Sequence, residues 1–292
     1  MTTLTPPPKI ESRPQGSPLG EFLRARRDSL SPSDVGIMDG SRRRVTGLRR
    51  QEVARVAGIS AEYYLRLEQG TDRQPSRQVL VALSRGLRLD ADGTRYLFRL
   101  AGQLDVTPPP EDSPCLAADV LEQWSSTPAY VVDRHQFVIG INDLGVELLP
   151  FLATPGTNLL EQTVLASLDS AEDRNDYWNA AIQTQVAALR FWCDSFNPQL
   201  RLLVASLSAK SKTFRDAWAR HEAHPARTGA TLAEVPPFGF LPFRWQVLEL
   251  PEQDQFLFAY SADSGAPESA AALDFLRAKI ALRRAVAASS RL

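Results

Sequence analysis

The sequence is poor in the residues that secreted domains and metalloproteins rely on. Its 292 residues include two cysteines, Cys115 and Cys193, and three histidines. Two distant cysteines do not make a disulfide scaffold, which favours a reducing, cytoplasmic compartment. No apolar run approaches the roughly 20 residues that cross a bilayer, and the proline-rich start lacks the apolar core of a signal peptide. We therefore expect a cytoplasmic protein with no membrane partner.

Catalytic motifs are also missing from the sequence. There is no HExxH or CxxC pattern, no Gly-rich phosphate loop and no GxSxG elbow. His221 and His224 have a spacing that some metal sites use, but a pair on a helix surface is the commoner explanation. We expect no enzyme activity, no catalytic residue, no metal and no cofactor.

Charge divides the chain into two unlike parts. From Leu19 to Ala101 there are 16 arginines, no lysine and 10 acidic residues, a net charge of +6. From Gly102 to Leu292, 15 basic and 23 acidic residues give −8. This asymmetry favours an anionic partner for the first part, although charge also drifts by chance along chains.

Proline content places the domain boundaries. Residues 1–18 are rich in Pro, Ser and Thr and predict a flexible N-terminal tail, and residues 103–115, which contain DVTPPPEDSP, predict a linker. Between them, residues 19–102 predict a domain of short helices. Residues 116–277 predict a second domain, and residues 278–292 the end of a C-terminal helix.

The segment Leu48–Gly70 predicts two helices that meet at a tight turn. Gly58 ends the first helix, Ser60 caps the second, and Gly70 ends it. Ala54 is small enough to let the helices cross closely. In such a motif the N-terminal half of the second helix reaches base edges in the major groove of DNA.

The residue types around this turn fit contacts to double-stranded DNA. Arg66 can donate two bonds to guanine, and Glu62 can accept one from cytosine. Tyr63 fits a base contact or core packing equally well. The insertion Ser29–Thr46 fits either an arm on the DNA or a solvated loop. The expected base contacts are Ser60, Ala61, Glu62, Tyr63 and Arg66, and the expected phosphate contacts are Arg42, Arg43, Arg44, Arg49, Arg50, Arg73 and Arg77.

The turn residues resemble those of the lambda-repressor-like, or Xre, helix-turn-helix regulators. The matching residues are Ala54, Gly58, Ile59, Ser60, Glu68 and Gly70. The resemblance implies an internal ion pair between Arg27 and Glu68. It also shows that Arg49 stands where the family usually has a Thr or Ser helix cap.

The second domain has strands at both ends and helices between them. AYVVD and QFVIGIN, separated by Arg134-His135, predict a hairpin, and three β-rich runs between residues 228 and 262 predict further strands. Helices are expected between these two groups, and a terminal helix from Pro267. This order predicts an α+β domain with an antiparallel sheet.

Several stretches of both domains resemble the MmyB-like transcriptional regulators. They are Leu19–Pro32, Thr46–Gly70, Thr127–Arg134, Asn142, Leu207–Glu222 and Phe256–Asp263. The resemblance implies a multidomain protein, an all-α lambda-repressor-like domain followed by an α+β, PAS-like domain that binds a small apolar ligand such as a fatty acid. The chain departs from the family at Ile141, where a Trp usually precedes Asn142.

Aromatic residues supply a candidate ligand pocket, although each also fits ordinary core packing. A fatty carboxylate needs a basic anchor, for which Arg190 and Arg244 qualify by charge. The expected pocket residues are Tyr130, Trp178, Trp192, Phe214, Trp218, Phe240, Phe243, Trp245, Arg190 and Arg244. The sequence thus predicts a homodimeric, DNA-binding transcriptional regulator that senses a small apolar ligand. The alternative is a helical protein-interaction adaptor or antitoxin-like module without ligand sensing.

Overall fold

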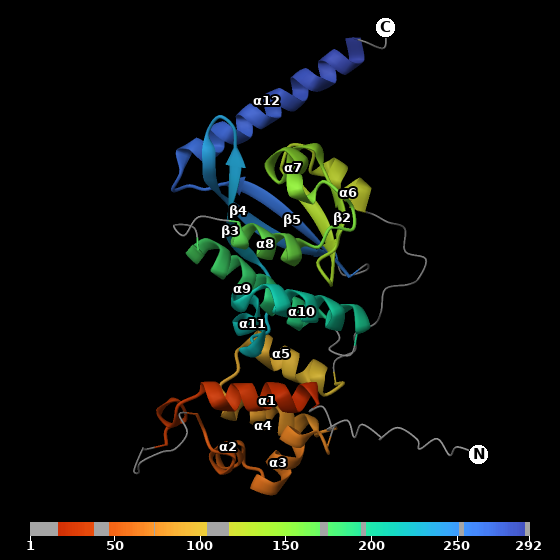
Figure 1. Cartoon of the computed structure of the whole chain (residues 1–292). Helices are drawn as coiled ribbons and strands as arrows, with labels where there is room; N and C mark the ends of the chain where they lie inside the picture. The colour runs from red at the N-terminus through yellow and green to blue at the C-terminus, as the bar shows by residue number, and fades with distance from the viewer. Residues whose placement is uncertain are drawn as a thin grey trace, which may run out of the picture. The chain divides into compact units, whose positions relative to one another are not determined.

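The computed structural model describes residues 17–37, 47–72, 74–103, 117–169, 175–193, 197–250 and 254–289. The chain divides into two compact units, Met1–Asp105 and Val106–Leu292. The division falls within the segment expected to be a linker. Helices α1 to α5 form the first unit, and the sheet with the remaining helices forms the second (Figure 1).

The described part of the first unit is helical. Side chains that accept a bond from the backbone three residues later cap four of its helices: Ser17, Ser60, Ser76 and Asp90. The expected cap at Ser60 is therefore confirmed. The elements are α1 (Pro18–Ser29), the 3-10 helix η1 (Pro32–Val35), α2 (Arg50–Ala57), α3 (Ala61–Gln69), α4 (Arg77–Gly86) and α5 (Ala91–Leu100).

Two glycines end the helices of the predicted turn motif. Gly58 follows α2 with φ +65°, and Gly70 follows α3 with φ +71°, a left-handed conformation that glycine adopts without strain. A third glycine, Gly20 of α1, lets that helix approach α3. A Cβ atom there would lie 2.2 Å from the carbonyl oxygen of Glu68. The motif thus depends on glycine for both its turns and its packing.

The core of the first unit is apolar, and Val56 of α2 lies at its edge. Leu23, Leu48, Tyr64 and Leu67 are fully buried. Val56 is 40% exposed. Val53 and Ala57 lie one turn apart on the buried face of α2, and at about 100° per residue the side chain of Val56 falls beside that face.

A five-stranded antiparallel sheet forms the centre of the second unit. The strand order is β2-β1-β5-β4-β3, and the expected hairpin is the β1–β2 pair. The strands are β1 (Ala129–Asp133), β2 (Val138–Ile141), β3 (Thr228–Val235), β4 (Gly239–Leu250) and β5 (Gln255–Ala262).

Helices precede, interrupt and follow these strands in the expected order. α6 (Ala117–Gln123) precedes β1, and α12 (Pro267–Ser289) follows β5. An all-α helix-turn-helix unit followed by an α+β, PAS-like unit confirms the expected fold class. The elements between β2 and β3 are α7 (Asp143–Leu148), the 3-10 helix η2 (Pro150–Leu152), α8 (Leu159–Leu168), α9 (Asn175–Trp192), α10 (Pro198–Lys210) and α11 (Lys212–Ala219).

The two faces of the sheet are covered by different elements. On one face, Tyr130, Phe258 and neighbouring strand residues pack in one core with residues of α7 and α12. On the other face, Val131 and Leu257 pack against α6. A separate core joins α8, α9, α10 and α11. On β4 the outward side chain of Gln246 stays exposed, so part of the α6 face is open.

Candidate nucleic-acid interface and ligand cleft

The structure brings the five expected base-contacting residues together on one side of α3 and its cap. Ser60, Glu62 and Arg66 are exposed, whereas Ala61 and Tyr63 are half-buried. The opposite side of the helix buries Tyr64 and Leu67. The hydroxyl of Ser60 accepts the backbone N–H of Tyr63 at 3.1 Å, so this residue also starts the helix.

Arg66 lies between two polar neighbours on the exposed face of α3. Its Nη1 atom is 3.8 Å from Oε1 of Glu62, and its guanidinium carbon is 5.5 Å from the centre of the Tyr63 ring. The Arg66 and Glu62 side chains are 51% and 83% exposed, so water screens their attraction. Arg66 and Glu62 can therefore give up their contact with each other for a contact with a base edge at little cost in free energy.

A buried carboxylate fixes the orientation of α3. Oε1 of Glu68 accepts from Nε of Arg27 in α1, and its Oε2 accepts from Nε of Arg50 in α2, both at 2.7 Å. Burial alone would raise the pKa of the fully buried Glu68, but bonds and charges from the two arginines outweigh it and lower that pKa. The ion pair with Arg27 is the one that the resemblance implied. The bond from Arg50 to Glu68 was not predicted, because Arg50 was expected only to contact DNA phosphates.

Three of the expected phosphate contacts lie in the described part of the chain. Arg49, Arg50 and Arg77 are exposed, although Arg50 also holds Glu68 and Arg77 lies 5.2 Å from the Phe98 ring. Arg49 caps α2 without a hydroxyl, because its backbone N–H donates to the carboxylate of Glu52. Arg42, Arg43, Arg44 and Arg73 lie outside the described residues.

The ten residues expected to line a pocket are not brought to one place. Most of these aromatic residues fill one of two cores instead. The sheet buries one group of them, and the layer of helices buries another. Trp178 is half-buried, and Phe240 is 46% exposed on β4. Tyr130, Trp192, Phe243 and Trp245 belong to the sheet core, and Phe214 and Trp218 to the helical core.

The two expected basic anchors also lie apart. Arg190 is buried, with its guanidinium 3.8 Å above the Trp218 ring, and its Nη1 atom is 3.2 Å from Nδ1 of His221. Burial, and then the charge of Arg190, lowers the pKa of His221 to about 4. Arg244 is half-exposed and lies 3.9 Å from Asp263. Neither arginine lines the cleft described next.

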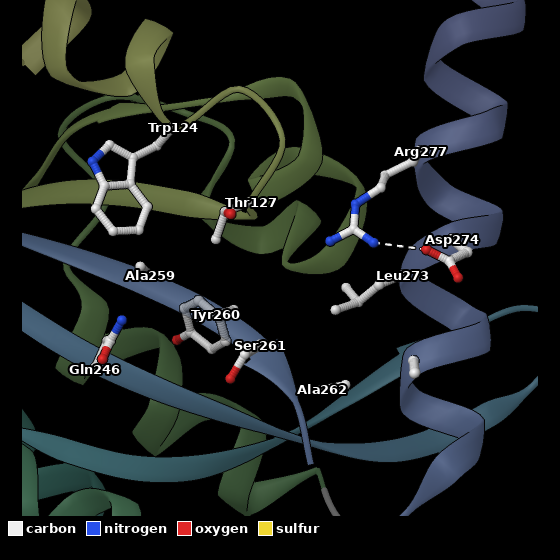
Figure 2. A pocket seen from close by; sticks show the side chains of 11 residues that line it. Trp124, Thr127, Gln246, Ala259, Tyr260, Ser261, Ala262, Leu273, Asp274 and Arg277 are labelled. Carbon is white, nitrogen blue, oxygen red and sulfur yellow. Dashed lines mark hydrogen bonds and ion pairs between the residues drawn. The ribbon is translucent and has the colours of Figure 1, made fainter. Parts of the chain in front are cut away.

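This cleft opens beside α12, on the α6 face of the sheet (Figure 2). It has a volume of about 310 Å³, at the lower end of the range for small-molecule sites. Polar and apolar side chains from three separate segments line it. These are the chain after α6 with Trp124 and Thr127, the strands with Gln246 and Ala259–Ala262, and α12 with Ala270, Leu273, Asp274 and Arg277.

Arg277 closes one side of the cleft. Its Nε atom donates to the Ser126 carbonyl at 3.1 Å, and its Nη1 atom bonds Asp274 at 2.7 Å. Figure 2 shows the guanidinium extending from α12 toward the segment of Thr127, with Leu273 one turn away. A cation beside apolar side chains suits an anionic group with an apolar body. The sequence prediction missed this arginine because no local motif links the three segments.

Asn142 holds the cleft wall in place. Its Oδ1 atom accepts from the backbone of Ala129 and Gly145, and its Nδ2 atom donates to the carbonyls of Trp124 and Thr127. One amide therefore joins the end of α6, the start of β1 and the start of α7. Both cleft residues at the end of α6 depend on it for their position.

The helix-turn-helix unit with its exposed α3 face and the following α+β unit define a DNA-binding transcription regulator with a ligand-binding domain. Comparison with protein families agrees with this class. Residues 18–97 match a helix-turn-helix domain, and residues 116–276, just over half of the chain, match the ligand-binding domain of MmyB-like transcription regulators. The chain belongs to the MmyB-like transcription regulators.

Two further findings concern this chain. A comparison with curated proteins found no significant match. In the part of the chain that the structure describes, no helix combines the length and apolar character needed to cross a membrane.

Proposed function

We propose that this regulator binds near-palindromic double-stranded DNA as a homodimer, and that a small, mainly apolar carboxylate in the α12 cleft controls it. The observation that carries the ligand proposal is the position of Arg277. It places a cation at the edge of a cleft whose other lining includes Trp124, Leu273 and the alanines of β5. A fatty-acid-like molecule with a short chain has the matching chemistry.

The DNA part of the proposal rests on the exposed face of α3. Arg66 carries the specificity, because its guanidinium can donate two parallel bonds to guanine. Glu62, one turn earlier on the same face, accepts from a cytosine amino group. Arg49 and Arg77, both exposed, add affinity through phosphates without reading sequence.

Ligand binding acts through α12. Arg277 attaches that helix to the Ser126 carbonyl, and a bound carboxylate competes for the same donor. A ligand shifts an equilibrium only through a difference in affinity between two states. The Ser126 carbonyl and a ligand carboxylate cannot both accept fully from the same edge of the Arg277 guanidinium. The ligand therefore has a higher affinity for the state in which the bond to Ser126 is broken, and this supplies the difference.

The test of DNA binding uses the full-length chain and genomic fragments, including its own promoter, across a series of salt concentrations. Arg66→Ala is expected to lose sequence preference, with a cost of about 1–3 kcal/mol for the preferred site. Arg77→Ala is expected to weaken all fragments alike and to reduce the salt dependence. Arg201→Ala, which removes an exposed arginine from α10, is the control. Weak binding without preference would favour the adaptor or antitoxin-like alternative.

The test of ligand binding titrates hexanoate, octanoate and decanoate into the protein by calorimetry. Affinity is expected to rise with chain length until the cleft is filled. Arg277→Gln is expected to weaken octanoate about tenfold, as loss of one charge-assisted bond implies. Arg201→Gln is the control on a surface away from the cleft lining. Equal affinity of both variants would refute the assignment of Arg277.

A further inference from the structure

The outward face of α12 has an unusual composition for a helix surface. Phe275 and Leu282 are 41% and 68% exposed, and the exposed residues Ala271, Ala278 and Ala285 alternate with them along the helix. None of these five carries a charge, whereas an ordinary surface helix places its charged residues toward water. We call these five residues the α12 seam.

The charged residues of α12 lie to either side of the seam. Lys279 and Arg283 bond Glu147 of α7 at 2.7 and 2.5 Å, and Arg284 bonds Asp143 at 2.6 Å. Leu273 and Ile280 are buried in the sheet core, on the opposite side of the helix from the seam. The helix thus has one face for the sheet core and a second, largely exposed apolar face on the opposite side.

The spacing of the seam is that of a coiled coil. Ala271, Phe275, Ala278, Leu282 and Ala285 follow one another at intervals of four, three, four and three residues. This mean spacing of 3.5 residues keeps a seam facing one partner helix along its whole length. Single exposed apolar residues are common, but a seam sustained over two heptads indicates a second helix.

We infer that the occupant of the seam is α12 of a second copy of this chain, running antiparallel. A two-fold axis at residue 280 places Phe275 opposite Ala285 of the second copy, and Ala278 opposite Leu282 of the second copy. Every large side chain then faces an alanine. A parallel pair would set Phe275 against itself and Ala278 against itself, which leaves gaps between the helices.

Two further observations favour a second copy over another protein. The seam carries no charge that would select a partner of opposite sign, and a two-fold pairing needs only the same surface twice. Phe238, 37% exposed in the β3–β4 turn, packs beside Phe275 with ring centres 5.8 Å apart and widens the apolar surface. Figure 1 shows α12 continuing past the sheet.

The size of the seam sets the expected strength. α12 has 23 residues and is about 35 Å long, so one helix pair buries less than a standard interface of about 1,600 Å². The dimer is therefore weak in solution, with a dissociation constant on the order of micromolar. Two half-sites on one DNA fragment raise the effective concentration of one copy of the chain beside the other, and so complete the dimer.

This inference deepens the proposed function, since it names the surface behind the proposed homodimer. The experiment is sedimentation equilibrium of the full-length chain without DNA, up to about 100 μM. The wild-type chain is expected to dimerise, and Leu282→Glu to raise the dissociation constant at least about tenfold. Leu202→Glu, at a 73% exposed position on α10, is the control and is expected to dimerise normally.

A second measurement tests the orientation of the two helices. Phe275→Cys and Ala285→Cys variants, each carrying Cys115→Ser, are mixed and oxidised. The antiparallel seam predicts a disulfide between the two different variants. Disulfides only within each variant would overturn the antiparallel arrangement.

The outcomes separate this inference from the proposed function. A wild-type chain that stays monomeric, or Leu282→Glu dimerising as tightly as wild type, would overturn the seam. Dimerisation that Leu282→Glu abolishes would support the seam even if the protein binds no preferred DNA fragment. In that case the proposed function fails and the interface stands.

Discussion

Both units contain a glutamate that binds two basic side chains, and the two arrangements differ in their exposure to water. Glu68 is fully buried, and Arg27 beside it is 12% exposed. Glu147 is 11% exposed, but its partners Lys279 and Arg283 are 48% and 63% exposed. A glutamate with two basic partners therefore fixes a helix firmly where the group is buried, as in the first unit. It holds a helix only weakly where the basic partners are exposed to water, as in the second unit.

The largest expected effect comes from removing the carboxylate of the first unit. Glu68→Ala leaves Arg27 without its partner in the core and is expected to lower the free energy of unfolding by about 3–5 kcal/mol. Urea denaturation measures this change. Glu62→Ala, on the exposed face of the same helix, should change it by no more than about 0.5 kcal/mol. Similar values for the two variants would contradict the central position given to Glu68.

The neutral amide of Asn142 holds the cleft wall of the second unit. Its removal should lower the free energy of unfolding by less than removal of the Glu68 carboxylate. Asn142→Ala removes four hydrogen bonds and is expected to lower the free energy of unfolding by about 2–3 kcal/mol. Asn142→Asp keeps the two acceptor bonds but turns a carboxylate oxygen toward the carbonyls of Trp124 and Thr127, so its loss should be at least as large. The same denaturation experiment applies. A clearly smaller loss in Asn142→Asp than in Asn142→Ala would show that the acceptor bonds alone carry the effect.

The half-buried imidazole of His221 is expected to make the stability of the second unit depend on pH. Its folded pKa is about 4, below the unfolded value of about 6.5, so the unfolded chain binds a proton first. Stability is full above pH 6.5 and falls as the pH drops toward 4. Because part of the ring meets water, the loss is about 1–2 kcal/mol. His221→Gln should flatten the profile in this window and His224→Gln should not.

The smallest effect on the free energy of unfolding is expected from Glu147, whose partners Lys279 and Arg283 are exposed to water. The hydrogen bond from Lys279 lowers the pKa of Glu147, burial opposes it, and Arg283 adds to the lowering. Since both cations are well exposed, Glu147→Gln should cost about 1 kcal/mol or less, and 0.5 M salt should reduce that cost. A loss as large as that of Glu68→Ala would remove the distinction between the two glutamates.

Local signals in the sequence predicted the elements well and the cleft poorly. Gly58, Ser60 and Gly70 act on their immediate neighbours, so their roles could be predicted from the sequence alone. The pairing of Arg50 with Glu68 joins residues 18 positions apart, and Arg277 reaches Ser126 across 151 positions. Such contacts depend on how elements pack, and no periodicity records them.

The aromatic residues show the same limit. Phe214 and Phe243 have the residue type of a pocket lining, yet both are fully buried in separate cores. Residue type reports that a side chain avoids water and does not report whether its neighbours leave space. The exposed position of Phe275 could likewise be known only once Leu273 and Ile280 were seen to face the sheet core.

The buried carboxylate of α3 also bears on the order in which the first unit assembles. A partly folded state with α3 docked but α1 or α2 detached would hold Glu68 in the core with one arginine or none. Such a state is costly, so the three helices are expected to form and open as one cooperative unit. Amide protons of α1, α2 and α3 should then exchange with solvent at a common rate under mildly destabilising conditions.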